Sequence, residues 1–283
     1  MLLATMLMLV KLAGEHHIAL PEIMFWRQAV TVPLLLGYLA STGGLARLRT
    51  ERLGSHAMRA ISGTTGMVCN FGAAILLPLA VSTTLGFTAP LFAVILAVAF
   101  MGERVGRWRF SAVALGFAGI LVITQPWDAP IAPLGAAAGL ASAFMIAIIN
   151  HQIRDLGRTE EPVRVVFWFA LFGSLFTAPM LPFVMTHHDL AGWLILIGMG
   201  TVGTLGQIFL TASLRFGAVT SVIVMDYTSL VWATLFGWAI WDQLPHAATW
   251  FGAPLIIAAG LIIAWREHKL SRPASQLTVN END

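Results

Sequence analysis

The stretch STTLGFTAPLFAVILAVAFMGERV, residues 82–105, contains a run of apolar and small residues long enough to cross a lipid bilayer. A membrane-spanning helix needs about 20 mainly apolar residues, and the first charge in this stretch is Glu103. The whole chain follows the same pattern: 58% of its 283 residues are apolar, 11% are charged, and the mean hydropathy is +0.81. So few charges cannot cover a water-facing surface, and the sequence therefore predicts an all-α protein embedded in lipid.

Outward from this stretch, the chain divides into ten apolar segments that we interpret as transmembrane helices. They are residues 1–14, 20–41, 57–77, 82–101, 110–124, 133–153, 165–185, 190–214, 218–240 and 247–265. The first is short, because fourteen residues at a rise of 1.5 Å reach only about 21 Å across a core of about 30 Å. We therefore expect the natural first helix to begin upstream of Met1.

Basic residues fall on one side of the membrane in this arrangement. With the N-terminus in the cytoplasm, all but two of the 16 Lys and Arg residues lie in or beside the inner loops and the tail, and the outer loops hold none. The two exceptions, Lys11 and Arg27, lie within spans. This separation follows the positive-inside rule and predicts a bacterial inner-membrane protein with both termini in the cytoplasm.

The two halves of the chain resemble each other at an offset of about 140 residues. Phe25-Trp26 matches Phe167-Trp168, and GILV from Gly119 matches GLII from Gly260. We predict a first five-helix repeat at 1–128, a second at 129–266 and a polar cytoplasmic tail at 267–283. Because five is odd, the second repeat enters from the opposite face, so the repeats are inverted. Inverted repeats are typical of secondary transporters, whose substrate site lies near the midplane between the halves.

Three features resemble one known family. They are the two five-helix repeats, Arg27 early in the second span after Phe25-Trp26, and residues 82–105 with their Gly102-Glu103 pair. In these features the chain resembles the EamA-type exporters of the drug/metabolite transporter superfamily, and among them most closely the YddG-type exporters of aromatic and other neutral amino acids. The resemblance implies an alternating-access exporter of such amino acids. The second repeat departs from the pattern, with Trp241-Asp242 where the first has Gly102-Glu103.

Charged residues within the spans are the first candidates for substrate binding, since a charge in the bilayer needs a partner or a cavity. Asp226 either faces a central cavity, where it binds an ammonium group or a proton, or pairs with Lys11 or Arg27. Arg27 either locks helix ends or meets a substrate carboxylate. Lys11 is placed to pair with Glu15, four residues on along one helical face, or to contribute to the site.

Polar and aromatic residues within the spans are the second set of candidates. Asn70 and Gln207 occupy nearly equivalent positions in the two repeats, so they either line a cavity or form hydrogen bonds between helices. Four aromatic side chains could form an apolar vestibule for an aromatic substrate: Trp26, Tyr38, Trp168 and Tyr227. Packing is the alternative role for each of them.

Several function classes are disfavoured by the motifs that the sequence lacks. It contains no phosphate-binding glycine loop, no nucleophile elbow and no metal-ligand motif, so we expect no cofactor, no bound metal and no enzymatic activity. The histidine pairs at 16–17 and 187–188 stand without further ligands. The expected partners are a small-molecule substrate and the bilayer, with no nucleic acid, and we expect a monomer. The alternatives to an amino-acid exporter are an exporter of other metabolites or drugs and a channel-like facilitator.

Overall fold

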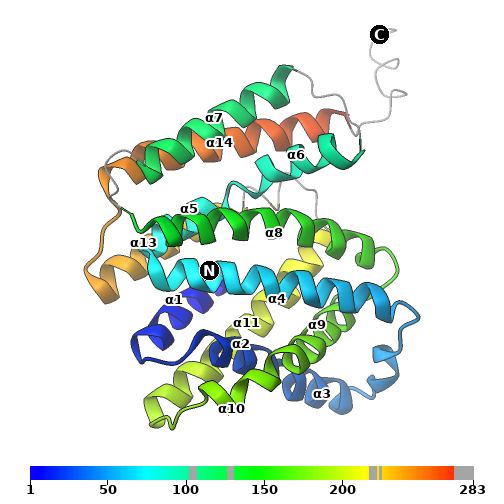
Figure 1. Cartoon of the computed structure of the whole chain (residues 1–283). Helices are drawn as coiled ribbons and strands as arrows, with labels where there is room; N and C mark the ends of the chain where they lie inside the picture. The colour runs from blue at the N-terminus through cyan, green and yellow to red at the C-terminus, as the bar shows by residue number, and fades with distance from the viewer. Residues whose placement is uncertain (102–106, 126–130, 217–221, 223–224, 271–283) are drawn as a thin grey trace, which may run out of the picture.

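A computed structural model describes residues 1–101, 107–125, 131–216, 222 and 225–270. In these residues the chain is helical throughout, with no strand (Figure 1). The Gly102-Glu103 pair, the predicted repeat boundary at 128–129, the start of the ninth span and most of the tail lie outside the described residues.

The helices reproduce the ten predicted spans, and some spans consist of two consecutive helices. The bounds are α1 Leu2–Glu15, α2 Leu20–Ala29, α3 Thr31–Ser41, α4 Leu53–Leu76, α5 Leu79–Gly86, α6 Ala89–Met101, α7 Arg107–Thr124, α8 Pro133–Gly157, α9 Pro162–Thr177, α10 Leu181–Val184, α11 Leu190–Phe216, α13 Thr228–Trp241 and α14 Ala247–Leu270. Short 3₁₀ turns, η1 Leu45–Leu48 and η2 Ala178–Met180, precede α4 and α10. The predicted fold class is confirmed.

Prolines account for the divided spans. A proline lacks the N–H that would bond the carbonyl four residues earlier, and its ring clashes with that carbonyl. Accordingly α2 ends four residues before Pro33, and α5 ends at Gly86, four residues before Pro90. Pro179 lies in the turn between α9 and α10. Pro254, by contrast, lies inside an unbroken α14, so it does not divide its span.

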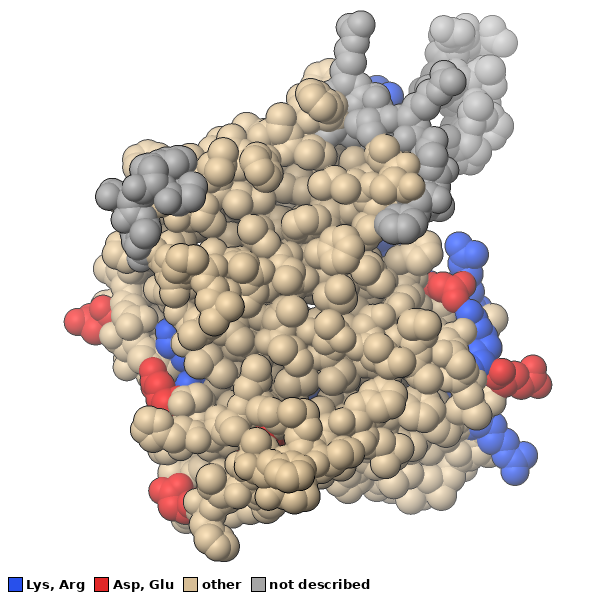
Figure 2. Space-filling model, viewed as in Figure 1, with Lys and Arg blue, Asp and Glu red and all other residues tan. Residues whose placement is uncertain are grey.

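Length and hydropathy single out most of these spans as membrane-crossing. Among the described residues, six segments are long and apolar enough: Leu20–Ser41, Leu79–Ala99, Pro133–Gly157, Pro162–Val184, Leu190–Phe216 and Ala247–Arg266. Phe110–Thr124 and Thr228–Trp241 are shorter apolar helices. Figure 2 shows charged side chains gathered at two opposite edges of the molecule, with a wide and almost uncharged band between them. This band has the surface that a bilayer requires.

The packing of the helices follows the two halves. Helix α1 packs on α11, and its counterpart in the second half, α8, packs on α4. Likewise α2 packs on α11, and its counterpart α9 packs on α4. Two further contacts, α2 on α9 and α7 on α14, join equivalent spans of the two halves. The interior is therefore formed between the halves rather than within each one, as expected for paired inverted repeats.

The two larger of the three apolar cores in the described residues result from this packing. One joins α1, α2, α4, α9 and α11 and includes Phe71, Phe169 and Met199. The other joins α5, α6, α7 and α14 and includes Leu85 and Ile256. In Figure 1, α7 and α14 run alongside each other, apart from the group of α2, α9 and α11.

Glycines set the closest approach between α7 and α14. A Cβ at Gly119 would lie 2.9 Å from the carbonyl oxygen of Gly252, and one at Gly252 would lie 2.8 Å from that of Gly119. No real Cβ tolerates a backbone oxygen at this distance, so the two backbones must separate when either glycine acquires a side chain. Close approach of this kind holds helices together in a membrane, where no hydrophobic driving force acts between them.

We expect Gly119→Ala to lower the melting temperature of the detergent-purified protein, because the added methyl group forces α7 and α14 apart at a cost of about 1–3 kcal/mol. Gly72→Ala on α4 is the matched control, since a Cβ there meets nothing within 4 Å. The control is expected to raise the melting temperature slightly through better helix propensity. Equal shifts of the same sign for the two variants would contradict this packing.

Candidate functional site

The two halves are tied together by polar contacts at one face, which we call the basic face and define by Arg47, Arg52, Arg164 and Arg215. Arg47, between α3 and α4, donates to Glu161, between α8 and α9, with Nε 2.8 Å from Oε2. Arg52 forms an ion pair with Asp155 near the end of α8. These predicted inner loops therefore meet in space, and their contacts close the basic face between the halves.

Glu160 is the centre of this network. Its carboxyl is buried, with 4% of the residue exposed. Thr50 Oγ1 donates to it over 2.7 Å and Arg164 Nη1 over 2.6 Å, while Arg215 donates to its backbone carbonyl over 2.8 Å. Burial favours a raised pKa, but the hydrogen bonds from Thr50 and Arg164 and the charge of Arg164 outweigh it and hold the pKa of Glu160 below its usual range.

A lowered pKa makes Glu160 a source of acid-sensitive stability. Its contribution is complete above the carboxyl's unfolded pKa and is lost as the pH falls through the lower folded value. We therefore expect Glu160→Gln to melt about 5 °C below wild type at pH 7, through loss of charged hydrogen bonds, and to lose less stability than wild type between pH 6 and pH 3. Melting curves across this range test it, with exposed Glu51→Gln as the control. Parallel curves for wild type and Glu160→Gln would contradict it.

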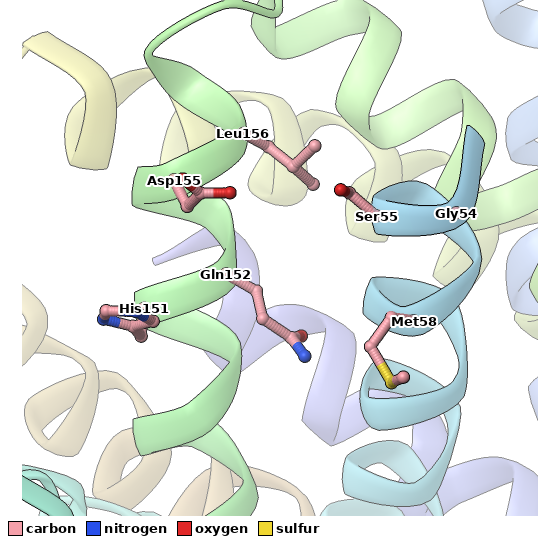
Figure 3. A pocket seen from close by; sticks show the side chains of 7 residues that line it. All are labelled: Gly54, Ser55, Met58, His151, Gln152, Asp155 and Leu156. Carbon is pink, nitrogen blue, oxygen red and sulfur yellow. The ribbon is translucent and has the colours of Figure 1, made fainter. Parts of the chain in front are cut away.

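A pocket of about 310 Å³ opens between α4 and α8 near the Arg52–Asp155 pair. Its lining residues are Gly54, Ser55, Met58, His151, Gln152, Asp155 and Leu156. Figure 3 shows Gln152 and Leu156 pointing from α8 toward Ser55 and Met58 on α4. Gln152 Nε2 also donates to Ser62 Oγ on α4 over 3.0 Å, so a hydrogen bond joins the two halves beside the pocket.

Two buried arginines lie deeper between the halves. Arg27 is 2% exposed and Arg59 is 3% exposed. Helix α2 begins at the face opposite the basic face, and α4 begins at the basic face. At a rise of 1.5 Å per residue, Arg27 and Arg59 each lie about 10 Å along their helix from its start, so the two helices bring them toward each other. Both guanidinium groups meet the ring of Phe169 on α9, at 5.4 Å for Arg27 and 4.3 Å for Arg59 from its centre. Both arginines therefore make a cation–π contact with the same ring.

Polar groups of α2 and α11 surround Arg27. Its Nη2 donates to Gln207 Oε1 over 3.3 Å. Thr31 Oγ1, at the start of α3, lies 2.7 Å from the Oγ1 of Thr204, which comes one turn before Gln207 on α11. Gln28, next to Arg27, is fully buried, and neither end of its carboxamide has a hydrogen-bond partner in the described structure. The result is a buried polar cluster between the halves, which we call the central cluster and define by Arg27, Gln28, Arg59, Phe169 and Gln207.

The arginines of the central cluster lack acidic partners. Nε and Nη1 of both Arg27 and Arg59 are buried without an acceptor. Among the described residues, no ion pair reaches either guanidinium. The nearest acid along α2, Glu22, instead meets His188, with Oε1 2.6 Å from Nε2. A buried, unpaired cation is costly inside a membrane, so the central cluster is the strongest candidate for a binding site.

The structure brings two predicted site residues into contact and gives the others separate surroundings. Arg27 and Gln207 are in contact, as described above. Asn70, the predicted counterpart of Gln207, is half-buried on α4, and in the described structure its side chain makes no hydrogen bond to the cluster. Lys11 lies toward the opposite face, where its Nζ donates to the Leu77 carbonyl over 3.0 Å and to Gln243 Oε1 over 3.5 Å.

The ion pairs that we considered for Lys11 and Asp226 are not formed in the described structure. Glu15 accepts a hydrogen bond from the Trp241 indole instead of pairing with Lys11. Asp226 is exposed two residues before α13 begins and pairs with neither Lys11 nor Arg27, whose side chains bond elsewhere. Spacing along one helix misled us here, because neighbouring helices offer competing partners that a single sequence does not reveal.

The four aromatic candidates do not form one vestibule. Trp26 packs edge-on against Trp193 and donates to Glu22, and Trp168 donates to the Leu48 carbonyl beside the basic face. Tyr227 packs against Phe87 in the second core, and Tyr38 is half exposed on the surface. In the described structure no ring contact joins any two of the four.

Sequence reasoning missed Arg59, Gln28 and Phe169. Arg59 is the third residue of the third predicted span, 57–77, and was counted with the basic residues of the preceding inner loop. The available signal was Gly63, one turn further on, where a Cβ would lie 2.1 Å from Arg59 Nη1. A glycine one turn from an arginine at the edge of a span leaves room for the guanidinium to fold inward, toward the core.

The geometry defines a helical membrane protein with a polar cluster buried between two halves, and comparison with known proteins identifies its class. The EamA-like transporter family matches residues 1–125 and again 133–265. The chain therefore belongs to the EamA-like transporter family, and it is a membrane transporter of small metabolites.

Three relatives show the range of this family. The chain is 31% identical over 260 residues to the pseudopaline exporter CntI of Pseudomonas aeruginosa, covering 89% of each. It is 28% identical to a riboflavin transporter of Vibrio cholerae, over 86% of this chain and 82% of the relative. It is 26% identical to an S-adenosylmethionine uptake transporter of Rickettsia bellii, over 87% and 82%. None of the three is named for amino acids.

The fold also matches a solved structure. A crystal structure at 22% identity superposes with a TM-score of 0.62 over 92% of this chain and 93% of the other. At this identity the match shows the fold alone.

Proposed function

We propose that the protein is a secondary transporter that exports small metabolites across the bacterial inner membrane by alternating access, working as a monomer with both termini in the cytoplasm. The observation that carries this proposal is the central cluster, a polar site buried between the two halves with unpartnered donors and closed toward the basic face. A closed face on one side of a buried site is one of the two states that alternating access requires.

The contacts at the basic face suggest the conformational step of the transport cycle, which is the separation of the two halves at this face. The Arg47–Glu161 and Arg52–Asp155 pairs and the bonds of Glu160 join the two halves. They must break for a substrate to pass between the cytoplasm and the central cluster. Exposed ion pairs suit such a step, because each contributes only about 0–1 kcal/mol and can open and close readily.

Aromatic and other neutral amino acids are the first substrate class to test. The α-carboxylate of an amino acid complements a buried guanidinium, and the Phe169 ring offers apolar surface beside it. The relatives named above carry other metabolites, so small metabolites and drugs form the comparison set.

The test is uptake of labelled L-phenylalanine, L-tryptophan and L-alanine into proteoliposomes, with and without an imposed pH gradient, for wild type and Asp226→Asn. Uptake that saturates and that unlabelled substrate inhibits would support a carrier mechanism. Dependence on the gradient that Asp226→Asn removes would assign proton coupling to Asp226, whereas equal uptake without a gradient would indicate a facilitator. No uptake of any amino acid would exclude this substrate class and turn the search to the comparison set.

A further inference from the structure

We propose that Arg27 and Arg59 bind two carboxylate groups of a single substrate, which makes small organic diacids the preferred substrate class. This inference rests on the proposed transport function, and it ranks acidic substrates above the neutral amino acids that are tested first. It concerns the central cluster, where two cations from opposite faces meet one aromatic ring.

The first argument is charge. Both guanidinium groups are almost fully buried, and both lie near the Phe169 ring, at 5.4 Å and 4.3 Å from its centre. Their mutual repulsion and their desolvation both disfavour the empty site. Every other described member of the central cluster is uncharged, so the missing negative charge must come from a ligand if the cluster is to be neutral.

The second argument is unused bonding capacity. Nη2 of Arg27 donates to Gln207, while its Nε and Nη1 are buried without acceptors. Nε and Nη1 of Arg59 are likewise buried without acceptors. Buried donors in proteins are nearly always satisfied, so two guanidinium groups with vacant donors indicate a site built for an acceptor that comes and goes. Arginine presents its donors as a planar fork that matches carboxylate geometry, which makes a carboxylate the best-fitting acceptor.

The third argument is that small residues keep the arginines in place. Nη1 of Arg59 occupies the volume that a Cβ on Gly63 would fill, at 2.1 Å from it. Gln28 Oε1 similarly fills the space of a Cβ on Gly173, at 1.5 Å. Glycines at these positions leave room for the polar side chains rather than for apolar packing, so the unpaired arrangement is what the surrounding helices accommodate.

Charge counting then ranks the substrates. A diacid brings one carboxylate to each guanidinium. A neutral amino acid brings one carboxylate and its own ammonium, which leaves the cluster with excess positive charge. The full amide of a diacid brings no charge at all, so it should bind worst despite its similar shape.

Ligand-induced stabilisation tests the ranking without relying on transport. The probes are succinate, 2-oxoglutarate, citrate and L-glutamate, each compared with its amide analogue at equal ionic strength on the purified full-length protein. We expect at least one acid to raise the wild-type melting temperature by about 5 °C at saturation, with little effect of its amide. Arg59→Met should abolish this shift, Arg59→Lys should reduce it, and Arg47→Met on the basic face should keep it.

Melting of the empty protein supplies a readout that needs no ligand. If the arginines are kept for an anion, Arg59→Met relieves repulsion and desolvation, so its empty melting temperature should equal or exceed that of wild type. Arg27→Met is the second variant. A marked fall for both, or failure of both to fold, shows that the arginines are structural and overturns the proposal, as does the absence of any acid-specific shift. If these results support the site while proteoliposomes show no transport, the proposed function fails and the binding site stands.

Discussion

Transport should stop when the basic face is cross-linked shut. In a Cys69→Ser background, Arg47→Cys and Glu161→Cys would place thiols on the two halves at positions whose native side chains are in contact. A short bifunctional thiol reagent with a reducible linkage then joins the halves. Because the basic face must open in each cycle, the cross-linked protein should lose transport to background and regain it on reduction.

The matched control is a cross-link within one half. Arg52→Cys and Ser55→Cys lie one turn apart at the start of α4, where Arg52 Nη2 donates to Ser55 Oγ over 3.4 Å. Linking them restrains no movement between the halves, so transport should continue. Full transport by the protein cross-linked between Arg47→Cys and Glu161→Cys would mean that the halves need not separate there, as in a channel-like facilitator.

Arg27→Met should reduce transport of an acidic or amino-acid substrate by at least about 100-fold, because losing one partner of a buried, hydrogen-bonded charge pair costs 2–5 kcal/mol and 1.4 kcal/mol is tenfold. Initial uptake of labelled L-phenylalanine, L-glutamate and succinate into proteoliposomes measures the effect. Arg47→Met, on the exposed basic face, should change uptake only a few-fold.

Gln207→Glu tests the same site by adding a carboxylate next to Arg27. The Gln207 amide oxygen already accepts from Arg27 Nη2 at 3.3 Å, so a carboxylate in its place would satisfy that guanidinium permanently. We expect this variant to melt above wild type and to transport poorly, since its own carboxylate competes with the substrate. A variant that is both less stable and fully active would contradict a carboxylate site at Arg27.

The architecture was predictable from the sequence because hydropathy and charge act over whole spans. Ten apolar stretches and the one-sided arginines were enough to predict the helix count, and the inner loops after the second and sixth spans do meet at the basic face. The division of spans also followed from chemistry, since Pro33 and Pro90 each lie four residues after a helix end. The boundaries of the two repeats and the cytoplasmic position of the termini stay predictions.

The site was predictable only in part, because most spans are apolar on every side. Periodicity then gives no inward face, so nothing in the sequence separates Trp26 from Trp168 or Tyr38 as a cavity residue. Charged residues in a span are easier to recognise as candidates, since each one needs a partner or a cavity, and Arg27 was predicted in this way. Arg59 escaped because a cation at a span edge has a simpler explanation at the surface, as a positive-inside residue.

Substrate counterflow tests the central claim most directly. Proteoliposomes loaded with an unlabelled probe, L-phenylalanine, L-glutamate or succinate, are diluted into a trace of the same labelled compound. An alternating-access carrier exchanges one for the other, so we expect the label to accumulate transiently above its equilibrium level and then to decay. A label that rises only to equilibrium for every probe that enters the vesicles would contradict the carrier and indicate a continuous pore.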